Sequence, residues 1–428
     1  MLFKNITIID ENFKVLDNMY VGVTNDKIDY ISKEIPKNNY DEMYDGKGKL
    51  VMSGFFNAHG HSPMTLMRGY GENMSLHDWL FQKIFPFEDG LTNDAVYYGT
   101  LLAMAESIRY GIVSTSDMYY FCDCMAQAVA DSGAKANISR SISNFDDEDL
   151  FQMVRGQEMK FLYENYHNTC DGRILVDASL HSEYTTTPKT VRQLAEYTKS
   201  IGINMHVHVS ETLKEHEECK DKYGMTPVAY LNKYGLFDTR TTAAHCVHVE
   251  GEDFDILKEK GVTVACNPIS NLKLASGVCN VPKLLDKGIN VAIGTDSVAS
   301  NNSLNFIEEM KMFAIAPKMM FKDATVVSPL DTIKAATING AFSQNRMDSG
   351  QIKVGNKADL TVLDISGPNM SPRHDLLNNL VYSASSNDVV LTMVNGKTLY
   401  KDGEYKTIDI EKTIYQVEKH TKLILKGL

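Results

Sequence analysis

Residues 51–61, VMSGFFNAHGH, end an apolar run with two histidines, His59 and His61, that one glycine separates. Side chains in an extended strand alternate between its two faces, so these imidazoles would point the same way. Two neutral imidazoles on one face can bind a single cation, whereas two unpaired ones inside a core are unfavourable. The motif by itself fits a metal site or a pair of histidines satisfied by backbone or water.

Seven later segments repeat the pattern of an apolar start and a polar end. They are residues 111–119, 134–143, 173–181, 203–211, 241–248, 261–268 and 289–297. Longer helix-like segments, such as DAVYYGTLLAMAESIRYG, separate them. Strand–helix alternation is typical of a parallel sheet, so eight such units predict an α/β protein with a closed (β/α)8 TIM-like barrel.

The ends of these predicted strands carry polar side chains of the kinds that perform chemistry. They are His59, His61, Asp117, Arg140, His181, His208, Glu211, His245, Asn267 and Asp296. Barrel active sites lie at the carboxyl ends of the strands, so these side chains would converge. Several strand ends that all supply histidine or aspartate favour a metal site over core packing.

Both ends of the chain differ from the middle, because short β-like runs there are broken by Asn, Asp and Gly. The dipeptides NG at 395–396 and DG at 402–403 are typical of hairpin turns. We expect residues 1–50 and 350–428 to form one small β-sandwich domain, and residues 51–349 to form the barrel.

The bulk composition excludes several classes of partner. The formal net charge is −12, and Lys and Arg form no block, which argues against nucleic acid and anionic membrane surfaces. The N-terminus, MLFKNITIIDENFK, lacks the apolar region of a signal peptide, and no apolar run is long enough to span a bilayer. The seven cysteines include no CxxC pair, so we expect free thiols and a cytoplasmic location.

Five motifs in order carry a family resemblance. They are GFFNAHGHSPMTLMRGYGENMSLHDWLFQKIFPFED (54–89), HVSET (208–212), AAHCVH (243–248), NPISNLKL (267–274) and GTDSVASNNS (294–303). The sequence resembles the amidohydrolase superfamily and, within it, the S-adenosylhomocysteine/5′-methylthioadenosine deaminases, which are related to guanine deaminases and triazine hydrolases. GQIKVGNKADLTVLD (350–364) looks like the family's return to the β-domain.

The resemblance implies a metal-dependent hydrolytic deaminase of adenosine-type nucleosides, working as a homo-oligomer. Metal-bound hydroxide would attack the 6-amino purine and release the inosine analogue and ammonia. The implied substrates are 5′-methylthioadenosine, 5′-deoxyadenosine, adenosine and S-adenosylhomocysteine.

Three imidazoles and one carboxylate suit one divalent transition metal. His59, His61, His208 and Asp296 are the expected ligands, with zinc favoured and iron or manganese also suitable. His206 shares a strand face with His208 but lies farther from the strand end, so we expect it in the core or behind the ligands. His245 is either a fourth ligand or a group that hydrogen-bonds the metal-bound water.

Three residues are expected to move or hold protons. Asp296 would accept the proton of the attacking water, and His245 would orient that water. Glu211, three residues beyond His208, would protonate a ring nitrogen of the purine. The alternative for Glu211 is a carboxylate that stabilises the N-terminus of the following helix.

Four residues are implied as substrate contacts beside Glu211. They are Glu88, for the ribose hydroxyls; Arg140, for an amino-acid carboxylate; His181, for a purine nitrogen; and Ser300, which supports the site on the last loop. The plainer alternatives are a surface carboxylate, a salt-bridged arginine and a strand-end histidine. Trp79 either walls the pocket or anchors a helix.

The stretch NFDDEDLFQMVRGQ (144–157) departs from the family, which has a second arginine in this region. Gln152 and Arg155 are the candidates for its role. The carboxylates of residues 146–149 would disfavour a substrate carboxylate. We therefore expect 5′-methylthioadenosine, 5′-deoxyadenosine or adenosine to be better substrates than S-adenosylhomocysteine.

Two other functions remain open at this stage. One is hydrolysis of another heterocycle, such as guanine, a pterin or a triazine, for which Glu88→Gln would leave turnover nearly unchanged. The other is a non-catalytic protein that keeps the barrel and has lost the metal, which metal content would distinguish.

Overall fold

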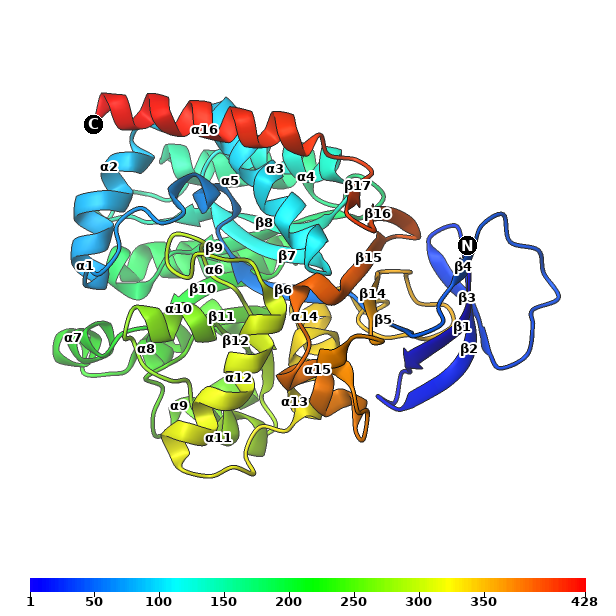
Figure 1. The fold of residues 1–428 in the computed structure, drawn as a ribbon. Coiled ribbons are helices and arrows are strands. Elements are labelled where there is room, and N and C mark those ends of the chain that lie inside the picture. The colour runs from blue at the N-terminus through cyan, green and yellow to red at the C-terminus, as the bar shows by residue number, and fades with distance from the viewer.

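The structure, a computed structural model, describes residues 1–428, apart from the side chain of His77. The chain forms an eight-stranded parallel sheet and a nine-stranded mixed sheet (Figure 1). The strands of the first sheet are β6 (Phe55–Gly60), β7 (Ile112–Tyr119), β8 (Lys135–Ile142), β9 (Ile174–Leu180), β10 (Met205–Val209), β11 (Thr241–His245), β12 (Thr263–Cys266) and β13 (Asn290–Ile293). Each lies within one of the eight segments that the sequence predicts.

The eight strands follow one another around a barrel in the order of the chain. A parallel bridge between Gly60 and Asp296 brings the last unit back to the first. The backbone N–H groups of Thr295 and Asp296 donate to His59 O at 3.1 and 3.0 Å. The predicted (β/α)8 barrel is therefore confirmed.

Helices surround the barrel and cover its mouth. They are α1 (Leu76–Trp79), α2 (Phe85–Glu88), α3 (Asn93–Arg109), α4 (Cys122–Ser132), α5 (Val154–Tyr166), α6 (Pro188–Ile201), α7 (Leu213–Tyr223), α8 (Pro227–Lys233), α9 (Asp253–Glu259), α10 (Pro268–Lys273), α11 (Val281–Asp286), α12 (Phe306–Phe321), α13 (Pro329–Ala336), α14 (Ile338–Ser343), α15 (Leu376–Tyr382) and α16 (Ile410–Gly427). Short 3₁₀ turns are η1 (Ser62–Met67), η3 (Glu183–Thr185), η4 (Leu236–Asp238), η5 (Pro368–Met370) and η6 (Ser386–Asp388), and η2 (Leu80–Ile84) is a π-helix.

Local sequence explains where these elements begin and end. Parallel barrel strands are buried on both faces, and every residue of β7 and β8 is buried. The Thr187 side chain accepts from Thr190 N at the start of α6, and Gly202, with φ 70°, ends that helix.

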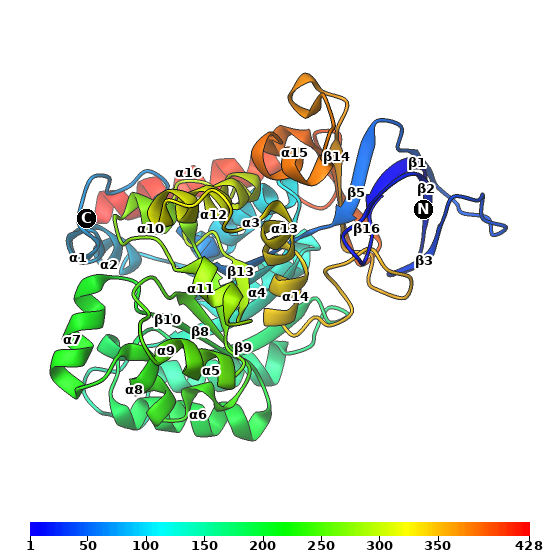
Figure 2. The same cartoon turned by 90° about the horizontal axis from the view of Figure 1, so that it is seen from below.

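The second sheet joins the two ends of the chain. Its strands are β1 (Leu2–Ile9), β2 (Val15–Thr24), β3 (Lys27–Ser32), β4 (Met43–Asp45), β5 (Lys49–Ser53), β14 (Leu360–Asp364), β15 (Val389–Val394), β16 (Lys397–Lys401) and β17 (Glu404–Tyr405). The central contact is antiparallel pairing of β5 with β14. Figure 2 shows this sheet at one side of the barrel.

Two details refine the expected domain boundaries. The run at 50–61 is two strands, because β5 pairs in the terminal sheet while β6 enters the barrel after Gly54. Helix α16 lies along α3, and the His420 ring stacks on Tyr98 at 6.0 Å between centroids (Figure 1). We retain the division into 1–50 with 350–428 and 51–349 as an interpretation, with β5 moved to the β-domain and α16 packed on the barrel.

Among the described helices, none is both long and apolar enough to cross a membrane.

Candidate active site

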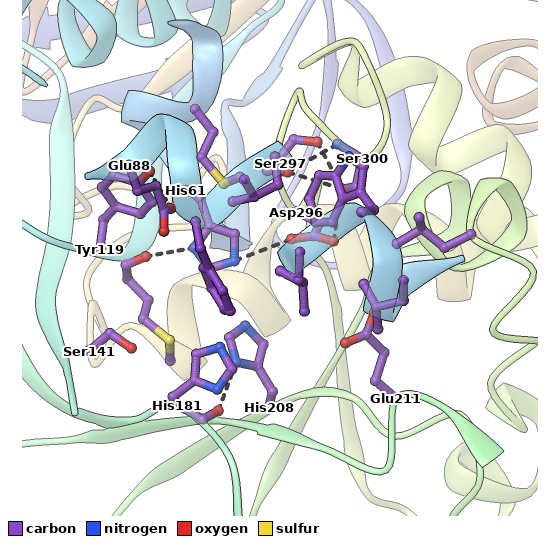
Figure 3. Close-up of a pocket in the computed structure, with 18 of the residues that line it drawn as sticks. His61, Glu88, Tyr119, Ser141, His181, His208, Glu211, Asp296, Ser297 and Ser300 are labelled. Atoms are coloured by element: carbon purple, nitrogen blue, oxygen red, sulfur yellow. Dashed lines mark hydrogen bonds and ion pairs between the residues drawn. The ribbon is translucent and has the colours of Figure 1, made fainter. Parts of the chain in front are cut away.

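A pocket opens at the carboxyl ends of the barrel strands, where the sequence places its polar residues (Figure 3). Its lining includes His61, Glu88, His181, His208, Glu211, His245, Asp296 and Ser300. His59 lies fully buried beside them. All the predicted site residues except Arg140 therefore meet at one place.

The expected metal ligands present their donor atoms to one another. The Nε2 atoms of His59 and His61 lie 3.5 and 3.3 Å from Asp296 Oδ1. Nitrogen donors of His59, His208 and His245 also lie within 4.8 Å of one another. The cluster thus contains the four expected ligands and His245.

The opposite nitrogen of each ring, Nδ1, is bound by the protein. Its partners are His206 Nε2 at 2.9 Å for His59, Met118 O at 2.6 Å for His61, His181 O at 2.8 Å for His208, and Asn271 Oδ1 at 2.8 Å for His245. A carbonyl oxygen only accepts, so His61 and His208 each carry a proton on Nδ1, which turns Nε2 toward the cluster. Such partners orient metal-binding histidines. The contact with His59 places His206 behind the cluster, as its sequence position suggests.

The chemical state of these groups fits a divalent cation. Burial lowers the pKa of His59 to about 3 and the pKa of His208 well below 6.5, so both rings are neutral. Burial would raise the pKa of Asp296, but His59 and His61 hold it well below 3.8. His59 Nε2 is buried and has no hydrogen-bond partner among the described residues. Burial would lower the pKa of His61, but its contact with Asp296 raises it above 6.5. Neutral His59 and His208 with an ionised carboxylate form a metal-type donor set, in which a bound cation would take the place of a proton on His61.

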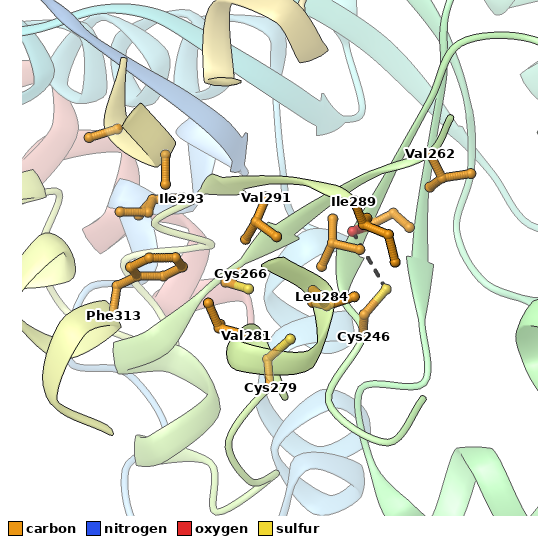
Figure 4. Packing of buried hydrophobic residues seen from close by; sticks show 14 of the residues in the cluster. Cys246, Val262, Cys266, Cys279, Val281, Leu284, Ile289, Val291, Ile293 and Phe313 are labelled. Atoms are coloured by element: carbon orange, nitrogen blue, oxygen red, sulfur yellow. Dashed lines mark hydrogen bonds between the residues drawn. The ribbon is translucent and has the colours of Figure 1, made fainter. Parts of the chain in front are cut away.

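Unusual backbone geometry turns these side chains toward the centre. His245 and Asp296 have φ of 72° and 59°, in the left-handed region that non-glycine residues seldom adopt. A side chain at Gly294 would place its Cβ 2.8 Å from that of His59, so only glycine permits this approach. Behind the site, Cys246 and Cys266 pack into the aliphatic core (Figure 4), and all seven cysteines are free thiols.

Two serines hold the far oxygen of Asp296. Ser270 Oγ donates to Asp296 Oδ2 at 2.5 Å, and Ser300 Oγ donates to the same atom at 3.1 Å. These bonds leave Oδ1 facing the histidines (Figure 3). Ser300 therefore has the supporting position expected of it, and Ser270 shares that position.

Glu211 lies beside His245 in the pocket lining, with Oε2 3.8 Å from His245 Nε2. Burial raises the pKa of Glu211, which favours a carboxyl group that carries a proton. Glu215 fixes the loop between β10 and α7, because its carboxyl group accepts from Ser210 N at 2.7 Å and from Glu211 N at 2.8 Å. Thr212 and Glu215 form the capping box of α7, so Glu211 is not needed as a helix cap.

Glu88 reaches the pocket from a covering segment. Pro86 lacks an N–H, and the backbone before it winds as the π-helix η2, a form often found at functional sites. Tyr119 donates its hydroxyl to Glu88 Oε1 at 2.6 Å, and burial raises the pKa of Glu88 to about 7. Trp79 both lines the pocket and packs in the core.

His181 lies on the same side as His208, with their ring centroids 5.0 Å apart. Its Nδ1 contacts Thr185 Oγ1 at 3.1 Å. Burial lowers the pKa of His181 to about 4, so the ring is neutral. The second ring nitrogen is thus available to a molecule in the pocket.

Arg140 lines a larger outer cavity that continues from the inner pocket. Its Nε donates to Glu158 Oε2 at 2.6 Å, and its guanidinium lies over Tyr120, 4.9 Å from the ring centroid. Arg155 also lines this cavity and donates to Ser143 O at 2.6 Å. Arg140 therefore lies outside the inner pocket, in the space that a 5′ substituent would enter, and it forms a salt bridge with Glu158, a partner that the sequence did not reveal.

The carboxylates of residues 146–149, expected to disfavour a substrate carboxylate, lie away from the outer cavity. Asp147 Oδ1 accepts from Thr187 at 2.5 Å, and Asp149 Oδ2 accepts from Gln193 at 2.6 Å, so these carboxylates secure the loop to α6. Residues 146–149 are not among the described residues that line the outer cavity, and neither is Gln152.

Sequence reasoning also missed Ser270, Asn271, Tyr119 and Glu215 as supporting residues. Ser270 and Asn271 lie in the motif NPISNLKL, where polar side chains follow the end of β12. That position was the available signal, because residues just after a barrel strand face the active site.

A model of the amidohydrolase family matches residues 50–399. The chain belongs to the amidohydrolase family. This amidohydrolase is 40% identical over its whole length to a protein from Caldanaerobacter subterraneus named 5-methylthioadenosine/S-adenosylhomocysteine deaminase, 99% of which is covered. A protein of the same name from Dictyoglomus thermophilum is 41% identical, with 100% of this chain and 99% of the relative covered.

Solved structures agree with this membership. An adenosine deaminase from Xanthomonas campestris with bound zinc superposes with a TM-score of 0.93 at 29% identity, covering 99% of this chain and 98% of that one. Atrazine chlorohydrolase TrzN from Arthrobacter aurescens, complexed with zinc, gives 0.91 at 22% identity, covers 98% of this chain and 99% of its own, and shows the shared fold alone. The superfamily resemblance in the sequence is confirmed, and the protein is a hydrolase.

Proposed function

We propose that this amidohydrolase is a metal-dependent deaminase of adenosine-type nucleosides. The observation that carries the proposal is one pocket that joins a metal-type donor set to Glu211 on one wall and Glu88 on another. The relatives named 5-methylthioadenosine/S-adenosylhomocysteine deaminase and the neighbouring adenosine deaminase structure support it.

His59, His61, His208 and Asp296 would hold one divalent cation, for which zinc is favoured because the neighbouring deaminase binds it. The cation would supply Lewis-acid activation of water at neutral pH. Asn271 Oδ1 contacts Nδ1 of His245 at 2.8 Å, so Nε2 of that ring is the atom that faces the cluster. His245 would therefore act as a further ligand or accept a hydrogen bond from the attacking water.

Two carboxyl groups of the pocket, those of Asp296 and Glu211, would transfer protons. Asp296 Oδ1, left open by the serines on Oδ2, would accept a proton from the attacking water. Glu211 would deliver its proton to a purine ring nitrogen as C6 becomes tetrahedral. A second proton transfer would let ammonia leave and yield the inosine analogue.

Substrate orientation would come from the remaining groups. Glu88 would accept the ribose hydroxyls, and His181 would contact a purine nitrogen. The 5′ substituent would then point into the outer cavity, toward Arg140. Because Glu158 already binds Arg140, we propose that 5′-methylthioadenosine is preferred over S-adenosylhomocysteine.

The test is ammonia release from 5′-methylthioadenosine, 5′-deoxyadenosine, adenosine, S-adenosylhomocysteine and guanine by zinc-loaded enzyme. We expect turnover of the adenosine compounds, with guanine inert, and a large loss in Glu88→Gln with every nucleoside. Turnover of guanine alone, or turnover that Glu88→Gln leaves unchanged, would replace the nucleoside assignment with another heterocycle.

We further propose a cytoplasmic homo-oligomer without nucleic-acid or membrane partners. The net charge of −12 supports the exclusion of polyanionic partners. Oligomerisation rests on the family resemblance alone.

A further inference from the structure

The outer cavity is much larger than a methylthio group requires. Its volume is about 1230 Å³, and it shares Leu80, Phe85, Glu88 and His181 with the lining of the inner pocket. The two spaces are therefore continuous at the residues that would surround the sugar. A substituent on the 5′ carbon of a bound nucleoside would extend into this outer space.

Three large apolar side chains are exposed at the rim of the cavity. Phe81, Phe145 and Leu213 have exposed fractions of 58, 69 and 58%. They come from three separate segments, namely η2, the loop after β8 and the first turn of α7. Exposed apolar side chains that gather at one cavity mark a surface that a ligand can cover.

Carboxyl groups outnumber cations in the lining of the outer cavity. The cations are Arg140, Arg155 and Lys214, and the carboxyl groups are Glu88, Asp89, Glu158, Glu215 and Glu218. Arg140 is bound to Glu158 at 2.6 Å, and Lys214 lies 3.9 Å from Glu218. A substrate carboxylate would have to displace Glu158 from Arg140, and exchanging one carboxylate for another returns little net energy.

We infer that the outer cavity selects uncharged apolar 5′-thioether substituents, alkyl or aryl groups larger than methyl, over an amino-acid tail. Apolar groups gain by covering Phe81, Phe145 and Leu213. The carboxylate of an amino-acid tail would instead enter a cavity with more carboxyl groups than cations, where Arg140 is already bound to Glu158. This inference rests on the proposed nucleoside deaminase activity and adds the chemical class of its 5′ substituent.

The first measurement is kcat/KM of the zinc-loaded enzyme for adenosine and its 5′-methylthio, 5′-butylthio and 5′-phenylthio derivatives, and for S-adenosylhomocysteine. We expect the butyl and phenyl compounds to exceed the methyl compound by about fivefold or more, since added apolar contact lowers KM. S-adenosylhomocysteine is expected below the methyl compound.

Two variants locate the effect. Phe145→Ser should bring the phenyl-to-methyl ratio of kcat/KM close to one, while Phe161→Ser, an exposed phenylalanine on α5 outside the cavity lining, should preserve it. Glu158→Gln should raise the ratio of S-adenosylhomocysteine to the methyl compound by about fivefold, because Arg140 becomes available. Glu164→Gln, on the same helix, is the matched control.

The outcomes separate the two proposals. Turnover of the methyl compound without any gain from butyl or phenyl groups would overturn this inference alone. S-adenosylhomocysteine as the best substrate would overturn this inference and the proposed preference for 5′-methylthioadenosine, while the deaminase activity would stand. No turnover of any nucleoside would overturn the proposed function and this inference with it.

Discussion

Buried polar groups at the two ends of the barrel differ in whether the protein itself satisfies their hydrogen bonds. At the carboxyl end, the His59 Nε2 atom is buried and has no hydrogen-bond partner among the described residues. At the amino end, Lys135 pairs with Asp359, which also accepts from Ser349 Oγ and Asn395 N at 2.9 Å each. The first cluster is open to a ligand, whereas the second is closed by the protein.

The closed cluster also joins two parts of the fold. Lys135 begins β8 of the barrel, and Asp359 precedes β14 of the terminal sheet. Arg346 lies nearby and donates to the carbonyls of Gly172, Ala136 and Arg173. Paired charges at the bottom of a barrel contribute to stability, while groups at the top serve the reaction. Variants at the two ends should therefore change different measurements.

The largest effect is expected at the open end. Asp296→Asn keeps the size of the side chain but removes the anionic oxygen, and should lower kcat/KM by about 10⁴-fold. The free energy of unfolding of the metal-free protein should change little, because asparagine fills the same space and its carbonyl oxygen can still accept from Ser270 and Ser300. Ammonia release, zinc content and urea unfolding would be measured on the same preparation.

Removal of the metal sharpens this prediction. Chelation should abolish ammonia release and zinc should restore it, while far-UV circular dichroism stays constant. An Asp296→Asn enzyme that retained most of its activity would contradict the assignment of the carboxyl end of the barrel to the reaction.

A smaller effect, on stability, is expected at the closed end. Asp359→Asn leaves Lys135 buried without its anion and should lower the free energy of unfolding by about 3–5 kcal/mol. The value of kcat at a temperature where the variant stays folded should match the wild type. Chemical unfolding and ammonia release check the two parts.

The pH dependence of that loss follows from the carboxyl group. Burial would raise the pKa of Asp359, but Lys135 holds it below its ordinary value of 3.8. A lowered native pKa stabilises the fold above the unfolded pKa, and this contribution is lost as pH falls through the native value. The difference in free energy of unfolding between wild type and Asp359→Asn should therefore be largest at neutral pH and decrease only below about pH 4. A difference that grew on acidification would contradict the ion-pair explanation.

The smallest effect is expected from a residue that acts through a histidine. Asn271→Ala removes the acceptor at Nδ1 of His245 and leaves Asn267 Nδ2 there at 3.2 Å, so the ring can change tautomer, and activity should fall by about 10–100-fold. A matched exposed variant, Asn165→Ala, should leave kcat/KM unchanged. If Asn271→Ala lowers the free energy of unfolding but leaves kcat/KM unchanged, then Asn271 serves stability, as Lys135 and Asp359 do.

The sequence by itself determined the barrel and the location of the site. Apolar runs that alternate with helix-like segments are a local signal, and so is a polar residue at the end of each run. His59, His61, His208, His245 and Asp296 could be selected because the ends of parallel strands must meet in a closed sheet. The family motifs added their expected roles.

Only the tertiary structure decided which partner each polar side chain takes. Ser270 reaches Asp296 across 26 residues, and Lys135 reaches Asp359 across 224 residues. Arg140 could meet a substrate or a protein carboxylate, and the fold of α5 supplies Glu158. Residue type limits the partners a group can accept, but the choice among them depends on distances that arise when separate segments pack together.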